Sequence, residues 1–326
     1  MTYLVTGGAG FIGSHLCEAL LGRGEQVIAL DNFNDYYDPQ RKRRNIAGLL
    51  GRPGFTLWEG DLRDPASLQA LFERHRPSHI AHLAGMANPR YSMQHPLLYS
   101  DVNVGGTVNL WECAARGGVR AFVQASTSSV YGASPTPWTE TTATDRPLSP
   151  YAATKKAAEV LCYTFHYQTS IPTRVVRFFT VYGPKGRPDM TPSIFVEAMR
   201  RGQPITLFNG GEGVYRDWTY IDDIVSGVVA TLDSDLPYEI FNLGNSQPVM
   251  LRSFIDTLQA ITGMEAIINP QPLPAADPSI TFADTSKARS LLGWAPTTDI
   301  EVGLERYWEW YLAEQANGSS TSKETS

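Results

Sequence analysis

Tyr3-Leu-Val-Thr-Gly-Gly-Ala-Gly-Phe-Ile-Gly-Ser14 predicts a short apolar strand that turns sharply into a helix. Such a turn directs backbone N–H groups toward one point at the positive end of the helix dipole, which suits a pyrophosphate. We expect Gly7 to allow the tight turn and Gly10 to let the backbone approach the phosphates. Gly13 would let the helix pack closely on the strand. By itself, this glycine pattern is also compatible with an ordinary strand–helix turn.

Asp31 is the second residue that points to a bound dinucleotide. It ends the next predicted strand, Gln26–Asp31, at about the spacing of the acid that binds an adenosine ribose. A carboxylate there bonds the ribose hydroxyls and repels a 2′-phosphate. The two features together predict dinucleotide binding, with NAD as cofactor rather than NADP.

Composition sets the broad class of protein. The 326 residues are 42% hydrophobic and 18% charged, which is ordinary for a globular chain. The net charge of -6 favours neither a nucleic acid nor a membrane surface as a partner. Cys17, Cys113 and Cys162 lack metal-ligand or redox spacing, so we expect no metal and a reducing, cytoplasmic location. Because the first strand begins at once and no long apolar run follows, we expect neither a signal peptide nor a membrane span.

The first half of the chain alternates short apolar strands with helical stretches. This rhythm predicts an α/β fold with a doubly wound, parallel Rossmann-type sheet. Residues 1–170 would form the NAD-binding domain, with a strand at 173–179 completing the sheet. Residues 180–312 would form mainly a smaller C-terminal α/β domain for substrate, and 313–326 a disordered tail. The predicted strands are Tyr3–Thr6, Gln26–Leu30, Thr56–Glu59, His79–Ala84 and Ala121–Ser126, and the predicted helices include Pro65–Arg74, Pro96–Arg116 and Pro150–Tyr167.

Ligands of such sheets lie beyond the carboxyl ends of the strands. Asp61 and Leu62 follow the third strand and can reach an adenine, whereas Leu83, Ala84 and Gly85 can let a cofactor pass close to the backbone. For each of these positions a structural turn is an equally good interpretation. The remaining cofactor candidates beside the glycine loop and the acid are Phe11, Ile12 and Asn32. The basic run 41–44 is interpreted as a solvated helix face.

Tyr151-Ala-Ala-Thr-Lys155 carries the predicted chemistry. A spacing of four places Tyr151 and Lys155 on one helical face. The pKa of a free phenol is about 10, but a nearby ammonium and a cationic nicotinamide ring favour the phenolate. Tyr151 can then accept a proton from a sugar hydroxyl, while Lys155 bonds the nicotinamide ribose. A hydroxyl that shares the proton is expected from the strand end 126–129.

These features resemble the extended short-chain dehydrogenase/reductase family, over roughly residues 1–312. The resemblance is to its nucleotide-sugar 4-epimerases, and it implies a catalytic triad of Ser or Thr, Tyr and Lys, of which the hydroxyl is Thr127. It also implies that Asn103 lies near the cofactor, and it makes a homodimer through the helices Pro96–Arg116 and Pro150–Tyr167 the expected assembly.

Two longer runs, 34–38 and 177–190, resemble the UDP-glucuronate 4-epimerase branch of that family. The resemblance implies that Thr180, Arg187, Ser128 and Ser129 cradle a uronate carboxylate. An arginine fork matches a carboxylate well. An ion pair between Arg187 and Asp189 within the loop is the competing interpretation.

The nucleotide end of the substrate is assigned by resemblance alone. Arg216 resembles the family's diphosphate-binding arginine, although a buried pair with Asp217 is the structural alternative. Asp277 lies where the family has Gly-Asp, but Ala276 replaces the glycine here. Arg90 belongs to a run that resembles a substrate loop.

The predicted activity is an NAD-dependent 4-epimerase, an isomerase that interconverts UDP-glucuronate and UDP-galacturonate through a transient 4-keto sugar. The alternatives are a UDP-glucose/UDP-galactose 4-epimerase, a UDP-glucuronate decarboxylase and a nucleotide-sugar dehydratase. Dehydratases typically carry an acid pair after the threonine, where Ser128 and Ser129 stand here. A plain reductase would need exchange with free cofactor, and NAD-sensing modules usually lose the Tyr/Lys pair.

Overall fold

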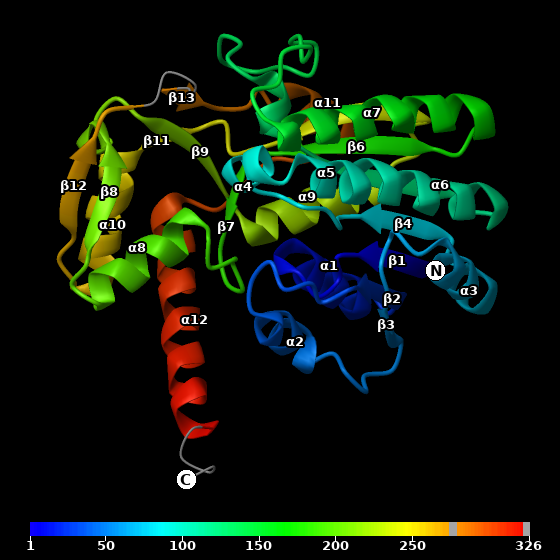
Figure 1. Cartoon of the computed structure of the whole chain (residues 1–326), viewed down its shortest axis with the longest axis horizontal. Helices are drawn as coiled ribbons and strands as arrows, with labels where there is room; N and C mark the ends of the chain where they lie inside the picture. The colour runs from blue at the N-terminus through cyan, green and yellow to red at the C-terminus, as the bar shows by residue number, and fades with distance from the viewer. Residues whose placement is uncertain (274–278, 322–326) are drawn as a thin grey trace.

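One parallel sheet forms the centre of the computed structural model, which describes residues 1–273 and 279–321 (Figure 1). Its order is β10-β6-β5-β4-β1-β2-β3. The strands are β1 (Thr2–Thr6), β2 (Gln26–Asp31), β3 (Phe55–Glu59), β4 (His79–His82), β5 (Ala121–Thr127), β6 (Thr173–Phe178) and β10 (Tyr238–Leu243). β1 pairs with both β2 and β4, so the strand order reverses there, where a ligand crevice is expected. The predicted doubly wound sheet is confirmed.

Both faces of this sheet are covered, which explains why its strands are almost continuously apolar. Successive residues point to opposite faces: Val5 packs with α1 (Phe11–Gly22) and α9 (Ile221–Asp233), whereas Leu4 packs with α3 (Pro65–His75), α6 (Gly106–Arg116) and α7 (Pro150–Thr169). Figure 1 shows α7 next to β6, α6 next to β4 and α1 next to β1.

Several helices begin at a polar cap followed by proline. Asp64 accepts hydrogen bonds from the N–H groups of Ala66 and Ser67, and Ser149 accepts one from Ala152. The fixed φ of proline suits the first helical turn, and the cap satisfies N–H groups that the helix leaves open. The same signal begins α2 (Pro39–Ala47) and α4 (Pro89–Gln94).

The predicted helix Pro96–Arg116 is interrupted. It consists of α5 (Pro96–Tyr99), a π-helical turn at Ser100–Gly105 and α6. π-helical turns occur mostly as local bulges and frequently at functional sites. This one packs against α7.

A second, smaller layer of strands and helices lies beside the large sheet. β9 (Tyr215–Tyr220) pairs with β7 (Thr180–Tyr182), β11 (Pro248–Met250) and β13 (Ile280–Thr281), and β8 (Pro204–Phe208) pairs with β12 (Ile267–Gln271). The helices of this part are α8 (Thr191–Arg200), α10 (Leu251–Thr262) and α12 (Ile300–Thr321), whereas α11 (Ser286–Leu292) packs against β10 and α9 of the large-sheet layer.

Two features differ from the predicted domains. Residues 221–243, which form α9 and β10, return to the large sheet, although the sequence assigned 180–312 mainly to substrate binding. α12 also continues to Thr321, so residues 313–321 are helical where a disordered tail was predicted. Good helix formers such as Ala313, Glu314 and Gln315 prolong a helix after its apolar stripe ends. Residues 322–326 lie outside the described part.

Across residues 1–273 and 279–321, no helix is both long and apolar enough to span a bilayer.

Candidate active site

The glycine loop has the geometry that its sequence predicts. Gly7 adopts φ of +67°, and its N–H donates to the Leu30 carbonyl at 2.7 Å. A Cβ atom on Gly13 would lie only 2.1 Å from the Gly7 carbonyl oxygen, so only glycine lets α1 approach β1 this closely. The N-terminus of α1 therefore opens toward the crevice at β1 and β4.

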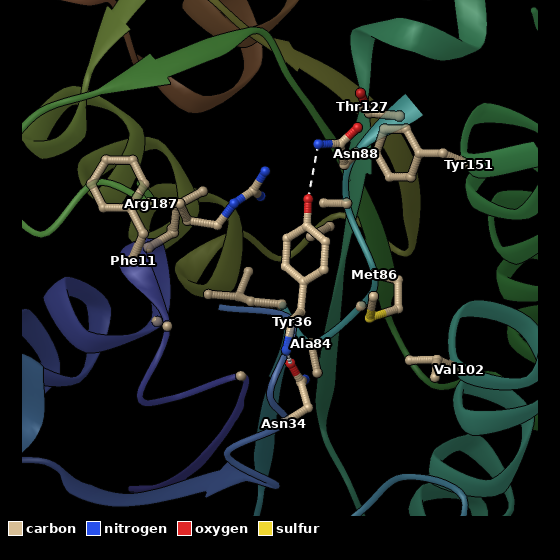
Figure 2. A pocket seen from close by; sticks show the side chains of 18 of the residues that line it. Phe11, Asn34, Tyr36, Ala84, Met86, Asn88, Val102, Thr127, Tyr151 and Arg187 are labelled. Carbon is tan, nitrogen blue, oxygen red and sulfur yellow. Dashed lines mark hydrogen bonds between the residues drawn. The ribbon is translucent and has the colours of Figure 1, made fainter. Parts of the chain in front are cut away.

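A cavity of about 550 Å³ lies at this crevice. That volume is within the range of small-molecule sites. The cavity brings together most of the predicted site residues: Gly7, Gly10, Phe11, Ile12, Gly13, Asp31, Asn32, Asp61, Leu62, Leu83, Ala84, Gly85, Thr127, Ser128, Ser129, Tyr151, Lys155, Thr180 and Arg187. Figure 2 shows Phe11 and Arg187 on one side of it and Thr127 and Tyr151 on the other.

Asp31 is buried at the end of β2 and is already hydrogen-bonded. Its carboxylate accepts from the N–H groups of Ala9 and Phe33, at 3.2 and 2.9 Å. Lys42 lies 3.5 Å away and is also buried, with only 6% of its surface exposed. The interpretation of the run 41–44 as a solvated face is therefore wrong for Lys42, because α2 turns this side chain back onto the acid and into the cavity wall.

Asp61 forms a second acidic group at the same end of the cavity. Arg63 donates to both of its carboxylate oxygens, and Asn32 donates to one of them at 2.8 Å. The bond from Arg63 holds the pKa of Asp61 well below its usual range. This carboxylate stays ionised at any physiological pH and can accept a hydrogen bond from a ligand.

The predicted catalytic groups come from two elements of the large sheet layer. Thr127 is the last residue of β5, and its hydroxyl oxygen accepts from the Ser129 N–H at 3.1 Å. Tyr151 and Lys155 occupy the first turns of α7, both buried. Figure 2 shows the Tyr151 ring directly below Thr127.

Burial opposes the charges that the chemistry needs. It raises the pKa of Tyr151, against which the Thr127 hydroxyl and the Arg187 charge act in the lowering direction. It also lowers the pKa of Lys155 to about 8. A bound cation beside Tyr151 would favour the phenolate further.

Arg187 lies in the loop between β7 and α8 and is held by Asp189. Its Nε and Nη2 donate to the two carboxylate oxygens of Asp189 at 2.9 and 3.0 Å. The loop ion pair considered from the sequence is thus present, and Arg187 also faces the cavity, where Thr180, Ser128 and Ser129 lie too. The two interpretations of Arg187 are compatible.

Sequence reasoning missed the partners of Asp189. The Tyr36 hydroxyl donates to Asp189 Oδ2 at 2.8 Å, and the Asn88 amide donates to the same oxygen at 3.1 Å and to the Tyr36 oxygen at 2.8 Å. Figure 2 marks the bond between Tyr36 and Asn88. No local sequence pattern predicts these contacts, because Asn88 and Tyr36 are separated from Asp189 by 101 and 153 positions in the chain.

Asn103 lies behind the cavity wall rather than in it. Its amide group accepts from the Met86 N–H at 2.8 Å and donates to the Met86 carbonyl and the Thr154 hydroxyl. It therefore ties the loop after β4 to α7, the helix that carries Tyr151 and Lys155.

Arg216 and Arg90, two of the residues predicted to hold the substrate, do not line this cavity. Arg216 donates to the Tyr215 carbonyl and lies half-buried on β9. Asp217 accepts from backbone N–H groups of Asn245, Ser246 and Ala283, which argues against a buried Arg216–Asp217 pair. Arg90 lies exposed, with its guanidinium 5.7 Å from the centre of the Phe208 ring. Asp277 lies outside the described residues.

Comparison with known proteins shows the family to which this chain belongs. Residues 3–244 match the model of the NAD dependent epimerase/dehydratase family. The chain belongs to this family. UDP-glucuronate 4-epimerase 1 of Arabidopsis thaliana is 43% identical over 331 residues, which cover 96% of this chain and 77% of the relative. UDP-glucuronate 4-epimerase of Thermodesulfobacterium geofontis is also 43% identical, over 94% of this chain and 95% of the relative.

A solved structure shares the fold of this chain. The crystal structure of UDP-glucuronic acid 4-epimerase from Bacillus cereus, in complex with UDP-glucuronic acid and NAD, superimposes with a TM-score of 0.89 and 35% identity. The match covers 95% of this chain and 98% of that one. The likeness therefore includes the smaller layer as well as the large sheet.

Proposed function

We propose that this chain is an NAD-dependent 4-epimerase that interconverts UDP-glucuronate and UDP-galacturonate. The observation that carries the proposal is the convergence on one cavity of a glycine loop, a Thr–Tyr–Lys set and an arginine. The first suits a dinucleotide, the second suits proton transfer at a sugar hydroxyl, and the third suits a carboxylate. Relatives named UDP-glucuronate 4-epimerase match nearly the whole chain.

The cradle fits NAD. Gly7 and Gly13 lack a Cβ that would clash with the backbone of Ala84 and Gly7, so the turn can bring the α1 N-terminus to the cavity, where it suits the pyrophosphate. Asp31 would accept from the adenosine ribose hydroxyls, and Asp61 would contact the adenine. Lys155 would bond the second ribose. NAD, when bound, supplies the hydride acceptor and donor for C4 of the sugar.

Tyr151 is the proposed acid–base group. It takes the proton of the 4-hydroxyl as the 4-keto sugar forms and returns a proton when the alcohol is restored on the other face. Thr127 shares that proton through its hydroxyl. The charge of Arg187 favours the phenolate form of Tyr151.

The site must hold the sugar carboxylate in a fixed orientation as well as recognise it. A 4-keto uronate is a β-keto acid, which readily loses CO₂. Arg187, Thr180 and the hydroxyls of Ser128 and Ser129 would bind the carboxylate and keep its C–C bond away from the alignment that this loss requires. The same contacts would select the acid over a neutral sugar.

We also propose a cytoplasmic homodimer. The outer face of α7 carries Val160, Tyr163 and Tyr167 at helical spacing, each at least half exposed, and Leu97 of α5 is 79% exposed. A second copy of this chain would cover these side chains by pairing helices. Sedimentation of the purified protein, compared with a Tyr163→Glu variant, tests this assembly.

The decisive experiment is to incubate the purified protein with UDP-glucuronate and no added cofactor. Chromatography should show UDP-galacturonate approaching an equilibrium mixture, because the hydride returns to the sugar. A UDP-pentose as the main product would indicate a decarboxylase instead. Unchanged substrate, even with NAD added, would refute the proposed function.

A further inference from the structure

The loop that carries Arg187 is anchored on both sides to the cofactor half of the molecule. Two residues before Arg187, the Lys185 ammonium donates to the Glu18 carboxylate on α1 at 2.6 Å and to the Asn45 carbonyl on α2 at 3.0 Å. Two residues after it, Asp189 accepts from Tyr36. The loop is therefore held on both sides of Arg187, at Lys185 and at Asp189, by residues that do not belong to the smaller layer.

Hydrogen bonds to Asp189 fix the orientation of the Arg187 guanidinium relative to the cavity. Asp189 takes the Nε and Nη2 hydrogens of Arg187, so Nη1 is left without a hydrogen-bond partner within the described residues. Tyr36 and Asn88 both donate to Asp189 Oδ2, which fixes the carboxylate in turn. Asp189 and Tyr36 are both half-buried, so water competes only weakly for these bonds.

Tyr36 is also part of the aromatic wall beside the catalytic tyrosine. Its ring centre lies 5.0 Å from that of Tyr91, in a cluster that includes Met86, Tyr99 and Tyr151. Figure 2 shows the Tyr36 side chain rising through the cavity from the loop after β2, between Arg187 and the Met86 side. Packing therefore leaves the Tyr36 hydroxyl little freedom to leave Asp189.

We propose that Tyr36 and Asp189 are positioning residues that orient Arg187 and so set the preference for an acidic over a neutral sugar. This inference rests on the proposed function and extends it to residues that do not themselves bind the carboxylate. Tyr36 acts through Asp189, and Asp189 acts through the two guanidinium nitrogens that it holds.

Tyr36→Phe is the first test, measured by calorimetric binding of UDP-glucuronate and of UDP-glucose to the full-length, NAD-loaded protein. Loss of a hydrogen bond to a charged group that aims Arg187 should weaken UDP-glucuronate about tenfold. UDP-glucose binding should stay within about twofold, since that ligand has no carboxylate to meet Arg187. Asn88→Ser keeps a capping oxygen for α4 but removes the amide donor, and should shift the ratio in the same direction.

Tyr311→Phe is the matched control. The Tyr311 hydroxyl donates to Glu197 at 2.6 Å, and Glu197 also accepts a fork from Arg200, so the same type of network is disturbed away from the cavity. Both ligands should bind Tyr311→Phe as they bind the wild type.

Arg187→Ala separates this inference from the function on which it rests. In that background, Tyr36→Phe should no longer change the ratio of the two affinities. Equal weakening of both ligands by Tyr36→Phe, or a ratio change that persists without Arg187, would overturn the positioning role alone. Failure of the wild type to bind either UDP-sugar would overturn the proposed function itself.

Discussion

Arg177 and Glu159 form a buried ion pair behind the proposed catalytic corner. Arg177 Nε and Nη2 each donate to the Glu159 carboxylate at 2.8 Å, and the Ser126 hydroxyl donates to the same carboxylate at 2.6 Å. Glu159 lies one helical turn beyond Lys155 on α7, while Ser126 precedes Thr127 on β5. The pair therefore fixes the helix that carries Tyr151 and Lys155 against the strand that carries Thr127.

Arg177→Met should destabilise the fold strongly, because it leaves the Glu159 carboxylate buried with one partner removed. We expect the free energy of unfolding in urea to fall by about 3–5 kcal/mol. Arg200→Met, which removes an exposed ion pair with Glu197, should leave it within error of the wild type. Similar losses in the two variants would show that the buried pair has no special weight.

Lys155→Met should stabilise the cofactor-free protein in a pH-dependent way. Because burial lowers the pKa of Lys155 from 10.5 to about 8, folding carries the cost of a buried ammonium at all pH values below about 8. Between about 8 and 10.5 the unfolded chain holds a proton that the folded chain has lost, so wild-type stability rises with pH. The variant should gain about 3 kcal/mol at pH 7 and progressively less toward pH 10. A gain that is constant across this range would contradict the burial of a charged lysine.

Gly13→Ala should damage the cofactor site. The added Cβ would meet the Gly7 carbonyl oxygen at 2.1 Å, so α1 must move away from the glycine loop. We expect a lower melting temperature and little NAD retained on purification, measured by absorbance after denaturation. Gly22→Ala, in the same helix, meets nothing within 4 Å and should be neutral or slightly stabilising. A normal NAD content in Gly13→Ala would contradict the assignment of the glycine loop to the cofactor site.

Arg187→Ala should impair uronate turnover selectively. Its guanidinium faces the cavity, and hydrogen bonds to a charged group are worth about 1.5–3 kcal/mol, so kcat/KM for UDP-glucuronate should fall about 10- to 100-fold. Any residual turnover of UDP-glucose should change much less. Equal losses on both substrates, measured by the same chromatographic assay, would count against a carboxylate-binding role.

Local patterns were sufficient for the framework of the site. The glycine spacing, the acid at the end of β2 and the Tyr151–Lys155 pair each depend on residues close in sequence. Local pattern also predicted six of the seven strands of the large sheet to within about two residues, but not β10. The uronate-binding assignment came from resemblance, since nothing local distinguishes Arg187 from any loop arginine beside an acid.

The remaining features depend on contacts between distant segments. Lys42 belongs to a run that looks solvated, and it is buried because α2 packs beside α1 and directs this side chain onto Asp31. Tyr36 and Asp189 are far apart in the chain, so their bond requires the tertiary fold. Asn103 bonds backbone atoms of Met86, and a buried asparagine in a helix gives no sequence signal for such a partner.

The return of α9 and β10 to the large sheet constrains how the large sheet and the smaller layer can move relative to each other. The backbone passes from the large sheet to the smaller layer after β6, returns between β9 and α9, and leaves again after β10. Several backbone connections between the large sheet and the smaller layer resist the wide separation of these two parts that a single hinge would permit. Turning over the sugar ring should therefore occur inside a nearly rigid frame, with side chains and the ligand supplying the motion.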